Sequence, residues 1–384
     1  MKIAIDCSKA VNEKAGIARY TWEIASHLPR IFTVDEFFYF FNFVRGDEEK
    51  KKLIESLISG RKNINYKIFR LPGSFKEKLF PSPFSILNSW IKNSDIYHAT
   101  EFLSFDRGLK IPQVLTVHDL SMIRFPAHRK KESAKHGKML ALACEKADAI
   151  ISVSQSTKLD IEKFFNIPAA KIDVVYSGYN TIFRKIVDRQ NSEKILKKYH
   201  IESPFLLFVG TIEPRKNISN LILAFNKFAQ SAEGKKYTLV LAGKHGWSTE
   251  EIEKTFNDSR VKEKISFLGY VPDEDLLYLY NNTALFCYPS IFEGFGFPPL
   301  EAMACGAPVL SSNVSSLPEV VGSAGKLVDP TDYVSIYNGI RQILTDKVLT
   351  DKMRQESLLQ AKKFSWDKCA RDTYRVYKKV LDEK

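Results

Sequence analysis

The sequence has no long hydrophobic run. Its most apolar short stretch is "FFYFFNFV" at residues 37–44, far below the ~20 residues that a membrane-spanning helix needs. The opening "MKIAIDCSKA" also lacks the apolar region and the small-residue cleavage site of a signal peptide. We therefore expect a cytoplasmic protein, and a peripheral contact with the inner face of the cell membrane stays open as an addition.

Paired cysteines and nucleic-acid motifs are also missing. The five cysteines are widely spaced and include no C-x-x-C pair, which argues against a disulfide framework or a thiolate zinc site. The net charge is +12, but basic residues are mixed with acids, as in "DEEKKK" at 47–52, and no zinc-finger, RRM or KH signature is present. We expect no nucleic-acid partner, whereas anionic lipid headgroups or a polyphosphate ligand fit the charge.

What the sequence does contain is a regular alternation of short apolar runs and amphipathic stretches. This alternation is typical of parallel sheets built from βα units, and 384 residues exceed what a single core usually supports. We expect an α/β protein of two domains with a ligand cleft between them. The candidate strands are 2–6, 37–43, 64–69, 95–99, 112–117, 148–153, 205–210, 238–243, 264–269, 284–290 and 308–312.

The βα series restarts after "SGYNTIFRKIVDRQNSEKILKKYH", which places the interdomain connection near 181–200. We assign residues 1–185 to the first domain and residues 195–364 to the second. No repeat of 20 to 50 residues is present, which excludes a solenoid.

The first chemically informative loop follows the candidate strand 205–210. In "GTIEPRKNISNLILAF", Gly210 permits a tight turn, and Arg215 and Lys216 precede Asn217, which we expect to cap the next helix. Two cations at a helix N-terminus favour an anion, because the helix dipole and the free N–H groups add to their charge. A diphosphate fits such a site; a surface pair of cations ahead of a capped helix remains the alternative interpretation.

The stretch "SIFEGFGFPPLEAMACG" at 290–306 combines a glycine-rich loop with a helix start. We expect the helix to begin at Pro298 or Pro299, since proline is tolerated in a first turn. Because proline has no N–H, the free donors of that turn would be those of Leu300 and Glu301. Only part of an anion-binding cradle would remain.

Two carboxylates lie in this same stretch. Glu293 precedes the expected helix and Glu301 lies in its first turn, so we expect both to point into one cleft. Gly294 and Gly296 would let the loop backbone come close to a ligand. Carboxylates make short hydrogen bonds to hydroxyl groups, which favours sugar-like groups there; a solvated loop glutamate is the alternative.

Two features of the first half add to this picture. "QVLTVHDLS" at 113–121 ends a strand at His118, which could donate to a substrate hydroxyl or to a charge developing in the transition state. In "GIARYTWEIA", Gly16 starts a helix, and Arg19 in its first turn opposes the helix dipole, which suggests that it is kept for an anion. A core or capping histidine and a solvated arginine remain open.

Two patterns are attractive false positives. "PDEDL" at 272–276 superficially matches an Asp-x-Asp metal motif, but acids are simply favourable where a helix opens. "GFGFPP" lacks the third glycine of G-x-G-x-x-G and lies far from the N-terminal βα turn of a dinucleotide fold. We therefore expect neither a metal site nor a dehydrogenase.

The motifs together resemble the retaining glycosyltransferases of family 4. "PSIFEGFGFPPLEAMACGAPVLSSNVSSLPEVVG" resembles the family's E-x7-E signature and "FVGTIEPRKNISNLILAF" its phosphate-binding loop, while "GIARYTWEI", "LTVHDLS", "ADAIISVSQSTKLDI" and "FSWDKCARDTYRVYKKVL" extend the likeness over nearly the whole chain. The resemblance implies the GT-B fold, two Rossmann-like domains with parallel sheets facing a central cleft. It also implies that 365–384 forms a helix crossing back onto the first domain.

The resemblance implies roles for individual residues. Arg215 and Lys216 would hold a diphosphate, Glu301 the ribose, and Glu293 the donor sugar, with His118 contacting that sugar as well. Catalytic roles fall to His118, Glu293, Arg215 and Lys216. Residue patterns and resemblance together predict nucleotide-sugar binding by Gly16, Arg19, Gly210, Arg215, Lys216, Glu293, Gly294, Phe295, Gly296, Phe297, Leu300 and Glu301. One departure is Ala18, where many relatives carry a second glycine.

"VHDLSMIRFP", "AGKHGWSTEEI" and "GFGFPPLEAM" are similar to bacterial mannosyltransferases that extend lipopolysaccharide O-chains. This similarity implies GDP-mannose as the donor substrate, a glycan or lipid-linked glycan as the acceptor, and neither a cofactor nor a metal ion. The segment 66–90 could rest on a membrane surface, or form an ordinary packed α/β segment. Two alternatives stay open, a GT-B sugar-nucleotide epimerase and a non-catalytic nucleotide-sugar-binding protein.

Overall fold

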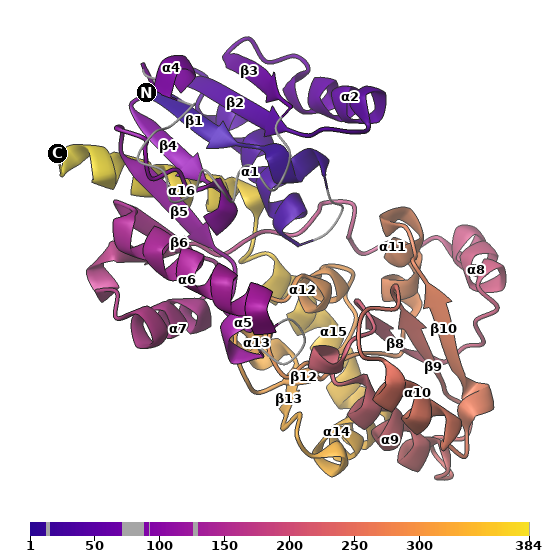
Figure 1. Ribbon diagram of the computed structural model, residues 1–384. Helices are drawn as coiled ribbons and strands as arrows, with labels where there is room; N and C mark the ends of the chain where they lie inside the picture. Colours follow the sequence, from indigo (N-terminus) through magenta and orange to yellow (C-terminus); the bar gives the residue numbers. More distant parts are fainter. Residues whose placement is uncertain (13–15, 71–87, 92, 126–129, 384) are drawn as a thin grey trace. The chain divides into compact units, whose positions relative to one another are not determined.

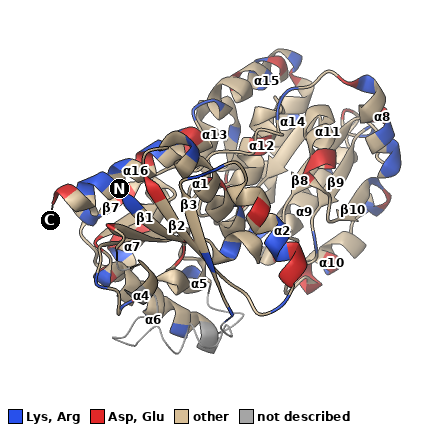
Figure 2. Ribbon diagram, turned by 90° about the horizontal axis from the view of Figure 1, so that it is seen from above, with Lys and Arg blue, Asp and Glu red and all other residues tan. Residues whose placement is uncertain are grey.

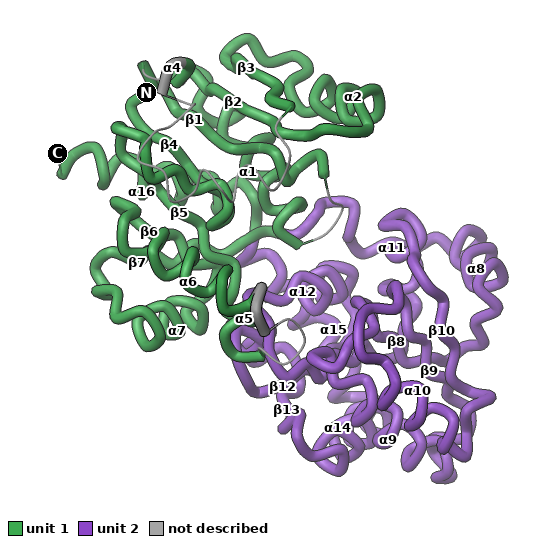
Figure 3. Tube along the Cα trace, in the orientation of Figure 1, with its two compact units in different colours: residues 1–178, 365–384 green, residues 179–364 purple. Residues whose placement is uncertain are grey.

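Two parallel sheets organise the part of the chain that the structure, a computed structural model, describes: residues 1–12, 16–70, 88–91, 93–125 and 130–383 (Figure 1). Each sheet belongs to its own compact unit (Figure 3). Unit 1 consists of Met1–Gly178 with Ser365–Lys384, and unit 2 of Tyr179–Phe364. The α/β fold class predicted from the alternation of elements is confirmed.

The sheet of unit 1 has the order β3-β2-β1-β4-β5-β6-β7, with all neighbours parallel. Its strands are β1 (Lys2–Asp6), β2 (Glu36–Asn42), β3 (Ile64–Phe69), β4 (Ile96–Ala99), β5 (Gln113–Val117), β6 (Ala149–Ser152) and β7 (Ile172–Val174). The helices of this unit are α1 (Ile17–Ile31), α2 (Asp47–Ile58), α4 (Asn88–Ile91), α5 (Ser121–Arg124), α6 (Lys130–Lys146), α7 (Gln155–Phe165) and α16 (Trp366–Asp382).

The sheet of unit 2 has the order β10-β9-β8-β11-β12-β13, again with all neighbours parallel. Its strands are β8 (Phe205–Val209), β9 (Thr238–Ala242), β10 (Ile265–Gly269), β11 (Leu285–Tyr288), β12 (Val309–Ser312) and β13 (Lys326–Val328). The helices are α8 (Arg189–Lys198), α9 (Ile218–Ala229), α10 (Glu250–Asn257), α11 (Asp273–Asn282), α12 (Phe297–Ala304), α13 (Leu317–Val321), α14 (Tyr333–Thr345) and α15 (Lys347–Ala361).

The central strands are buried on both faces. β5 and β12 are buried at every residue, and so is β4. A parallel sheet has helices on both faces, so its central strands have no solvent face and their sequences run nearly continuously apolar instead of alternating. This is why these strands could be recognised from sequence.

The boundary between the units differs from the predicted one. The chain enters unit 2 at Tyr179, whereas residues up to 185 were assigned to the first domain. The reason is packing: the Phe183 ring meets the Tyr280 ring with centroids 5.4 Å apart, and Asn281 binds the carbonyl of Arg184 and the N–H of Ile186. These contacts attach 183–186 to α11 of unit 2.

Helix α16 belongs to unit 1 although it ends the sequence, and it packs against α1. Its first residue, Trp366, places its ring edge-on against Tyr20, with centroids 6.1 Å apart. Further along, the Tyr377 hydroxyl lies 2.6 Å from Nδ1 of the buried His98 in β4. An apolar face and one buried polar contact therefore fix the helix to unit 1.

Charge is mixed on the surface helices. Figure 2 shows basic and acidic residues together on α2 and on α16. Such helices are ordinary solvated surfaces. None of the helices in the described ranges combines the length with the apolar character that a membrane crossing would require. Residues 71–87, which make up most of the segment 66–90, lie outside the described residues.

Helix α16 begins close to Gly178, the last residue of the stretch Met1–Gly178 of unit 1, and this approach can be tested. A Cβ added at Gly178 would come 2.2 Å from the backbone nitrogen of Trp366. We expect Gly178→Ala to destabilise unit 1 by about 1–3 kcal/mol, because the start of α16 must shift. Urea unfolding followed by tryptophan fluorescence measures this loss.

Gly137→Ala in α6 is the matched control. A Cβ there meets only Ile123 side-chain carbons at 3.5 Å or more, and alanine is favoured over glycine inside a helix by about 0.5–1 kcal/mol. A Gly178→Ala midpoint equal to that of the control would contradict this account of how α16 is seated.

Candidate active site

The candidate site of unit 2 lies where the strand order reverses, between β8 and β11. The strands on either side of that point send their connections in opposite directions, and ligands of open α/β sheets bind there, beyond the carboxyl ends of the strands. The loop after β8 carries Glu213, Arg215 and Lys216, and the segment at the end of β11 carries Tyr288 and Ser290. Sheet topology therefore brings the two loops together.

Arg215 is held between two carboxylates. Its Nε and Nη2 donate to Oε1 of Glu213 at 3.2 and 2.8 Å. Its Nη1 donates to Oε2 of Glu293 at 2.9 Å and to the carbonyl of Phe292 at 2.7 Å. The guanidinium is thus fixed from opposite ends by groups from both loops, and one of them, Glu213, was not anticipated from the sequence.

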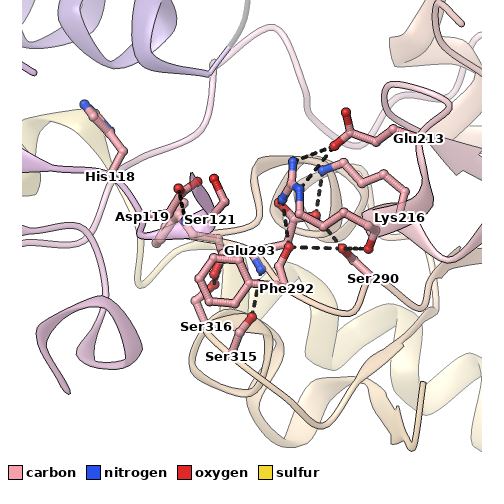
Figure 4. Close-up of polar contacts among 12 residues, drawn as sticks. His118, Asp119, Ser121, Glu213, Lys216, Ser290, Phe292, Glu293, Ser315 and Ser316 are labelled. Atoms are coloured by element: carbon pink, nitrogen blue, oxygen red, sulfur yellow. Dashed lines mark hydrogen bonds and ion pairs between the residues drawn. The ribbon is translucent and has the colours of Figure 1, made fainter. Parts of the chain in front are cut away.

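Lys216 is buried and paired with the other oxygen of Glu293. Its Nζ donates to Oε1 of Glu293 at 2.6 Å and to the Tyr288 hydroxyl at 2.8 Å. The same Oε1 also accepts from the Tyr288 hydroxyl at 3.0 Å and from the Ser290 hydroxyl at 2.7 Å. Figure 4 shows these contacts of Lys216, Ser290 and Glu293.

The charges of this cluster cancel, since Arg215 and Lys216 face Glu213 and Glu293. Burial would raise the pKa of Glu293, but the nearby Lys216 and Arg215 charges prevail and lower it to about 2. Burial lowers the pKa of Lys216, and Glu293 opposes that effect. The two predicted phosphate ligands are therefore present together, but each already has an internal anion.

Asn217 does not cap α9 with its side chain, in contrast to the expectation. It adopts a left-handed backbone conformation, with φ +59°, and its amide donates to the carbonyls of Pro289 and Pro330 at 2.9 and 2.6 Å. The side chain therefore ties the loops after β8, β11 and β13 together. It supports the shape of the site instead of presenting the helix terminus to an anion.

The loop 293–296 is shaped by two serines that follow β12. The N–H of Glu293 donates to the Ser315 hydroxyl at 2.9 Å, and the Ser316 hydroxyl is placed to donate to the carbonyls of Glu293 and Phe295 at 3.0 and 2.8 Å. Gly296 has φ +113°, and a Cβ there would come 2.9 Å from Leu317. A glycine is therefore required at 296, because the positive φ disfavours other residues and a Cβ would clash with Leu317.

Helix α12 begins earlier than expected, at Phe297, with Gly296 as its N-cap. The N–H of Leu300 therefore points to the Gly296 carbonyl at 3.5 Å, inside the helix, and Glu301 lies in the second turn. Their predicted role as free first-turn donors is wrong, because the helix starts before the prolines. The Phe297 and Phe295 rings pack edge to face, with centroids 5.3 Å apart.

The two glutamates of the E-x7-E stretch have separate partners. Glu301 is buried, and Oε2 accepts from the Tyr280 hydroxyl at 3.2 Å. Glu293 is bound by the cations and hydroxyls described above. The pair therefore has two distinct environments within unit 2, one with a tyrosine on α11 and one with the basic loop.

In unit 1, His118 follows β5 and is held in a defined tautomer. Its Nε2 lies 2.8 Å from the carbonyl of Thr100. Because a carbonyl only accepts, Nε2 carries the proton, and Nδ1 of the neutral ring is an acceptor. Burial lowers the pKa of His118, which favours this neutral form. The Tyr20 ring meets the imidazole edge to face at 4.9 Å.

With the Nε2 proton directed at the Thr100 carbonyl, the neutral ring presents Nδ1, which can accept a hydrogen bond but cannot donate one. The expected role of His118 as a donor to a substrate stays a prediction. The sequence could place the histidine after a strand, but it could not identify the carbonyl that fixes the ring.

The other predicted residues have simpler settings. Gly16 caps α1 with φ +59° and open space around it. The charge of Arg19 lies near Glu23, one helical turn later. Burial raises the pKa of Glu23 to about 7, and the positive charge of Arg19 opposes this rise. Gly210 follows β8, and a Cβ at the neighbouring Gly243 would come 1.8 Å from its carbonyl oxygen, so these two strand ends approach as closely as glycine permits.

The acidic "PDEDL" stretch opens α11, and Asp275 is bound by Lys198 and Tyr199, each at 2.6 Å. In the described ranges, no three or more His, Cys, Asp and Glu side chains form a group that could hold a metal ion. Asp275 therefore has ordinary structural partners.

Sequence reasoning missed the residues that support the cations. Glu213 stands two positions before Arg215, and that spacing in an extended loop was its only signal. Tyr288 and Ser290 were read as parts of one strand, 284–290, but β11 ends at Tyr288 because Pro289 follows. Their side chains therefore leave the sheet at the site.

Comparisons with known proteins agree with this architecture. A family model described as "Glycosyltransferase Family 4" matches residues 15–183, and one described as "Glycosyl transferases group 1" matches residues 189–360. The chain is 37% identical to O-antigen chain mannosyltransferase B of Escherichia coli over 287 residues, 74% of each protein. It is 36% identical to the serotype-specific mannosyltransferase WbdA of Escherichia coli over 58% of this chain and 28% of that longer protein.

A solved structure of HepE from Anabaena in complex with UDP-glucose has a TM-score of 0.75 to this chain at 17% identity, covering 100% of both chains. Likeness at that identity establishes the fold alone. Together with the family models and the relatives above, it shows that the chain belongs to the family 4 glycosyltransferases and has the GT-B fold of two Rossmann-like domains.

Proposed function

We propose that the protein is a retaining mannosyltransferase that moves mannose from GDP-mannose to a glycan or lipid-linked glycan in cell-surface polysaccharide synthesis. The observation that carries the proposal is the pair Arg215 and Lys216, fixed side by side at the strand-order reversal of unit 2. The 37% identity to an O-antigen mannosyltransferase supports the choice of mannose.

Arg215 and Lys216 would neutralise the diphosphate as it leaves the sugar. Sugar transfer develops negative charge on the leaving phosphate and positive charge on the sugar carbon. Fixed cations in a buried setting stabilise such charge more strongly than they do in water. They would supply the electrostatic help that a divalent metal gives in other transferases.

The rest of the donor would be held by the groups already predicted. Glu301 would bind the ribose, and the backbone of 294–297 would approach the sugar, because hydrogen bonds to Ser315 and Ser316 fix the start of that loop. In unit 1, Nδ1 of His118 would accept a hydrogen bond from a sugar hydroxyl. Gly16 and Arg19 would contribute at the phosphates.

The chemical step would break the bond between the anomeric carbon and the phosphate oxygen and form one to the acceptor oxygen on the same face. The departing phosphate oxygen would take the acceptor's proton, so the step balances without an enzyme nucleophile. Glu293 supports this scheme, because its Oε2 accepts from Arg215 and its Oε1 from Lys216, Tyr288 and Ser290. Trapping of a covalent sugar on a carboxylate would reject it.

The acceptor would be presented at the inner face of the cell membrane, and the net charge of +12 supports a peripheral contact with anionic headgroups there. The protein itself would be cytoplasmic. This part of the proposal concerns place and acceptor, and it does not affect the roles of the donor-site residues.

A thermal-shift panel of nucleotide sugars tests the donor. A ligand that binds only the folded protein raises its stability by mass action, so we expect GDP-mannose to give the largest shift and Lys216→Ala to abolish it. Arg215→Lys, which keeps the charge but loses the planar fork, should reduce the shift. An undiminished shift in both variants would place the phosphates elsewhere.

Chelation tests the metal-free mechanism. Because two side-chain cations take the place of a divalent ion in this account, we expect excess EDTA to leave the turnover of GDP-mannose and acceptor unchanged. Loss of turnover with EDTA and its return with Mg²⁺ or Mn²⁺ would contradict the assignment.

The tautomer of His118 can be observed directly. Long-range ¹H–¹⁵N NMR spectra at pH 7 should show a neutral ring protonated at Nε2, because Thr100 accepts that proton. The titration midpoint should lie below the ordinary histidine value, since burial disfavours the imidazolium. A ring protonated at Nδ1, or a midpoint above the ordinary value, would refute the acceptor role.

A further inference from the structure

Unit 1 has a strand-order reversal of its own, between β1 and β4. Ligands of open parallel sheets bind at such a point, beyond the carboxyl ends of the strands. The corresponding point of unit 2, between β8 and β11, is taken by the donor diphosphate in the proposed function. A group transfer has a second substrate, the acceptor, and the reversal in unit 1 offers a separate place for it.

An ion pair spans this reversal. Lys9 belongs to the short 3₁₀ turn Ser8–Val11 that follows β1, and Glu101 comes two residues after the end of β4. Lys9 Nζ lies 3.8 Å from Oε1 of Glu101. The side chain of Glu101 is 8% exposed and that of Lys9 is 24% exposed, so the pair combines a nearly buried carboxylate with a more accessible ammonium group.

Buried hydrogen bonds fix the backbone beneath both charges. The N–H of Ser8 donates to Oδ1 of Asp6 at 2.8 Å, and the Ser8 hydroxyl accepts from the N–H of Asn42 at 2.9 Å. The Thr100 hydroxyl donates to the carbonyl of Asp6 at 2.9 Å. The two charged residues are each next in sequence to one of these anchors. Their backbone is therefore held in place before a ligand binds, which lowers the cost of binding.

His118 lies at the same edge of the sheet. Its Nε2 donates to the carbonyl of Thr100, the residue before Glu101. Burial is the main reason why the pKa of His118 is lowered, and the charge of Lys9 adds to this effect, so the ammonium lies near the imidazole. Side chains that follow three neighbouring strands, β1, β4 and β5, therefore gather at one edge.

The chemistry of this pair suits the hydroxyl groups of a sugar. A hydroxyl both accepts and donates, so it can accept from an ammonium and donate to a carboxylate at once, and such charge-assisted bonds are stronger than neutral ones. The 3.8 Å between Lys9 Nζ and Glu101 Oε1 lets one hydroxyl oxygen make bonds of ordinary length to both. An anion would be repelled by Glu101 and a cation by Lys9, which favours a neutral ligand.

We propose that Lys9 and Glu101 form an acceptor subsite in unit 1, where they bind hydroxyl groups of the hexose that receives the mannose. This inference rests on the proposed function, because it takes the protein to be a transferase whose donor diphosphate is bound in unit 2. It adds two binding residues and specifies a neutral sugar as their ligand.

Steady-state kinetics with GDP-mannose and octyl α-mannoside separates the two substrates. Glu101→Gln keeps the shape of the side chain and removes its charge, which weakens a bond to a hydroxyl. We expect the KM for the octyl mannoside to rise about tenfold or more, as for the loss of a hydrogen bond to a charged group, and the KM for GDP-mannose to stay within about twofold. Lys9→Met should act in the same direction, and Lys9→Arg, which keeps the charge, should retain most of the affinity.

Lys379→Met is the matched control. Lys379 also pairs with a carboxylate of unit 1, that of Asp173 at 3.1 Å, but at the edge strand β7. This variant should keep the wild-type KM for the octyl mannoside, and its urea unfolding midpoint should equal that of Lys9→Met. An equal rise of the acceptor KM in both lysine variants would contradict a specific role for Lys9.

Deoxy analogues of the octyl mannoside identify the contact. An analogue that lacks a bound hydroxyl should react less well with the wild-type protein, by about tenfold in kcat/KM. On that analogue Glu101→Gln should cause little further loss, because the bond is already absent. The full penalty of Glu101→Gln on every analogue that keeps the attacking hydroxyl would overturn the proposal.

The remaining outcomes are equally decisive. If Glu101→Gln raises the KM for GDP-mannose and leaves that for the acceptor unchanged, the pair contacts the donor sugar, and the inference fails. Unchanged KM values for both substrates also contradict it. Wild-type protein that binds GDP-mannose but transfers nothing to the octyl mannoside overturns the inference alone. Wild-type protein that binds no nucleotide sugar of the panel overturns the proposed function, and the inference with it.

Discussion

A buried ion pair between Lys216 and Glu293 is the interaction on which the site depends. Removing water from a lysine is costly unless an anion compensates it, and a buried pair that loses one partner is strongly destabilised. Glu293 supplies that compensation, while Glu213 does the same for Arg215. The protein can therefore keep two cations at a fixed place inside unit 2 before any phosphate arrives.

The sheet order explains why these residues meet. Arg215 and Glu293 are 78 positions apart in sequence, and their loops follow β8 and β11, which are neighbours in the sheet. The reversal of strand order between them leaves space beyond the strand ends, with Tyr288 and Ser290 pointing into the cluster. In unit 1, the same logic places His118 after β5 beside Thr100, which follows the neighbouring strand β4.

Much of the fold followed from the sequence, because central parallel strands are continuous apolar runs. The edge strands β7 and β13 were missed, since Ile172–Val174 and Lys326–Val328 are three residues long and include a charge. The residues Arg215, Lys216 and Glu293 could be singled out by type and spacing. Their pairing with one another, the anchoring of Asn217 and the tautomer of His118 could not, because each depends on contacts between loops distant in sequence.

The central claim is that side-chain cations held by internal carboxylates bind the donor diphosphate. A crystal structure of the protein with GDP-mannose, or with the panel's best nucleotide sugar, tests it most directly. The account predicts a phosphate oxygen within hydrogen-bonding distance of Lys216 Nζ, with the Glu293 carboxylate still bound to that nitrogen. A diphosphate bound away from Lys216 and Arg215, or coordinated to a metal ion, would contradict it.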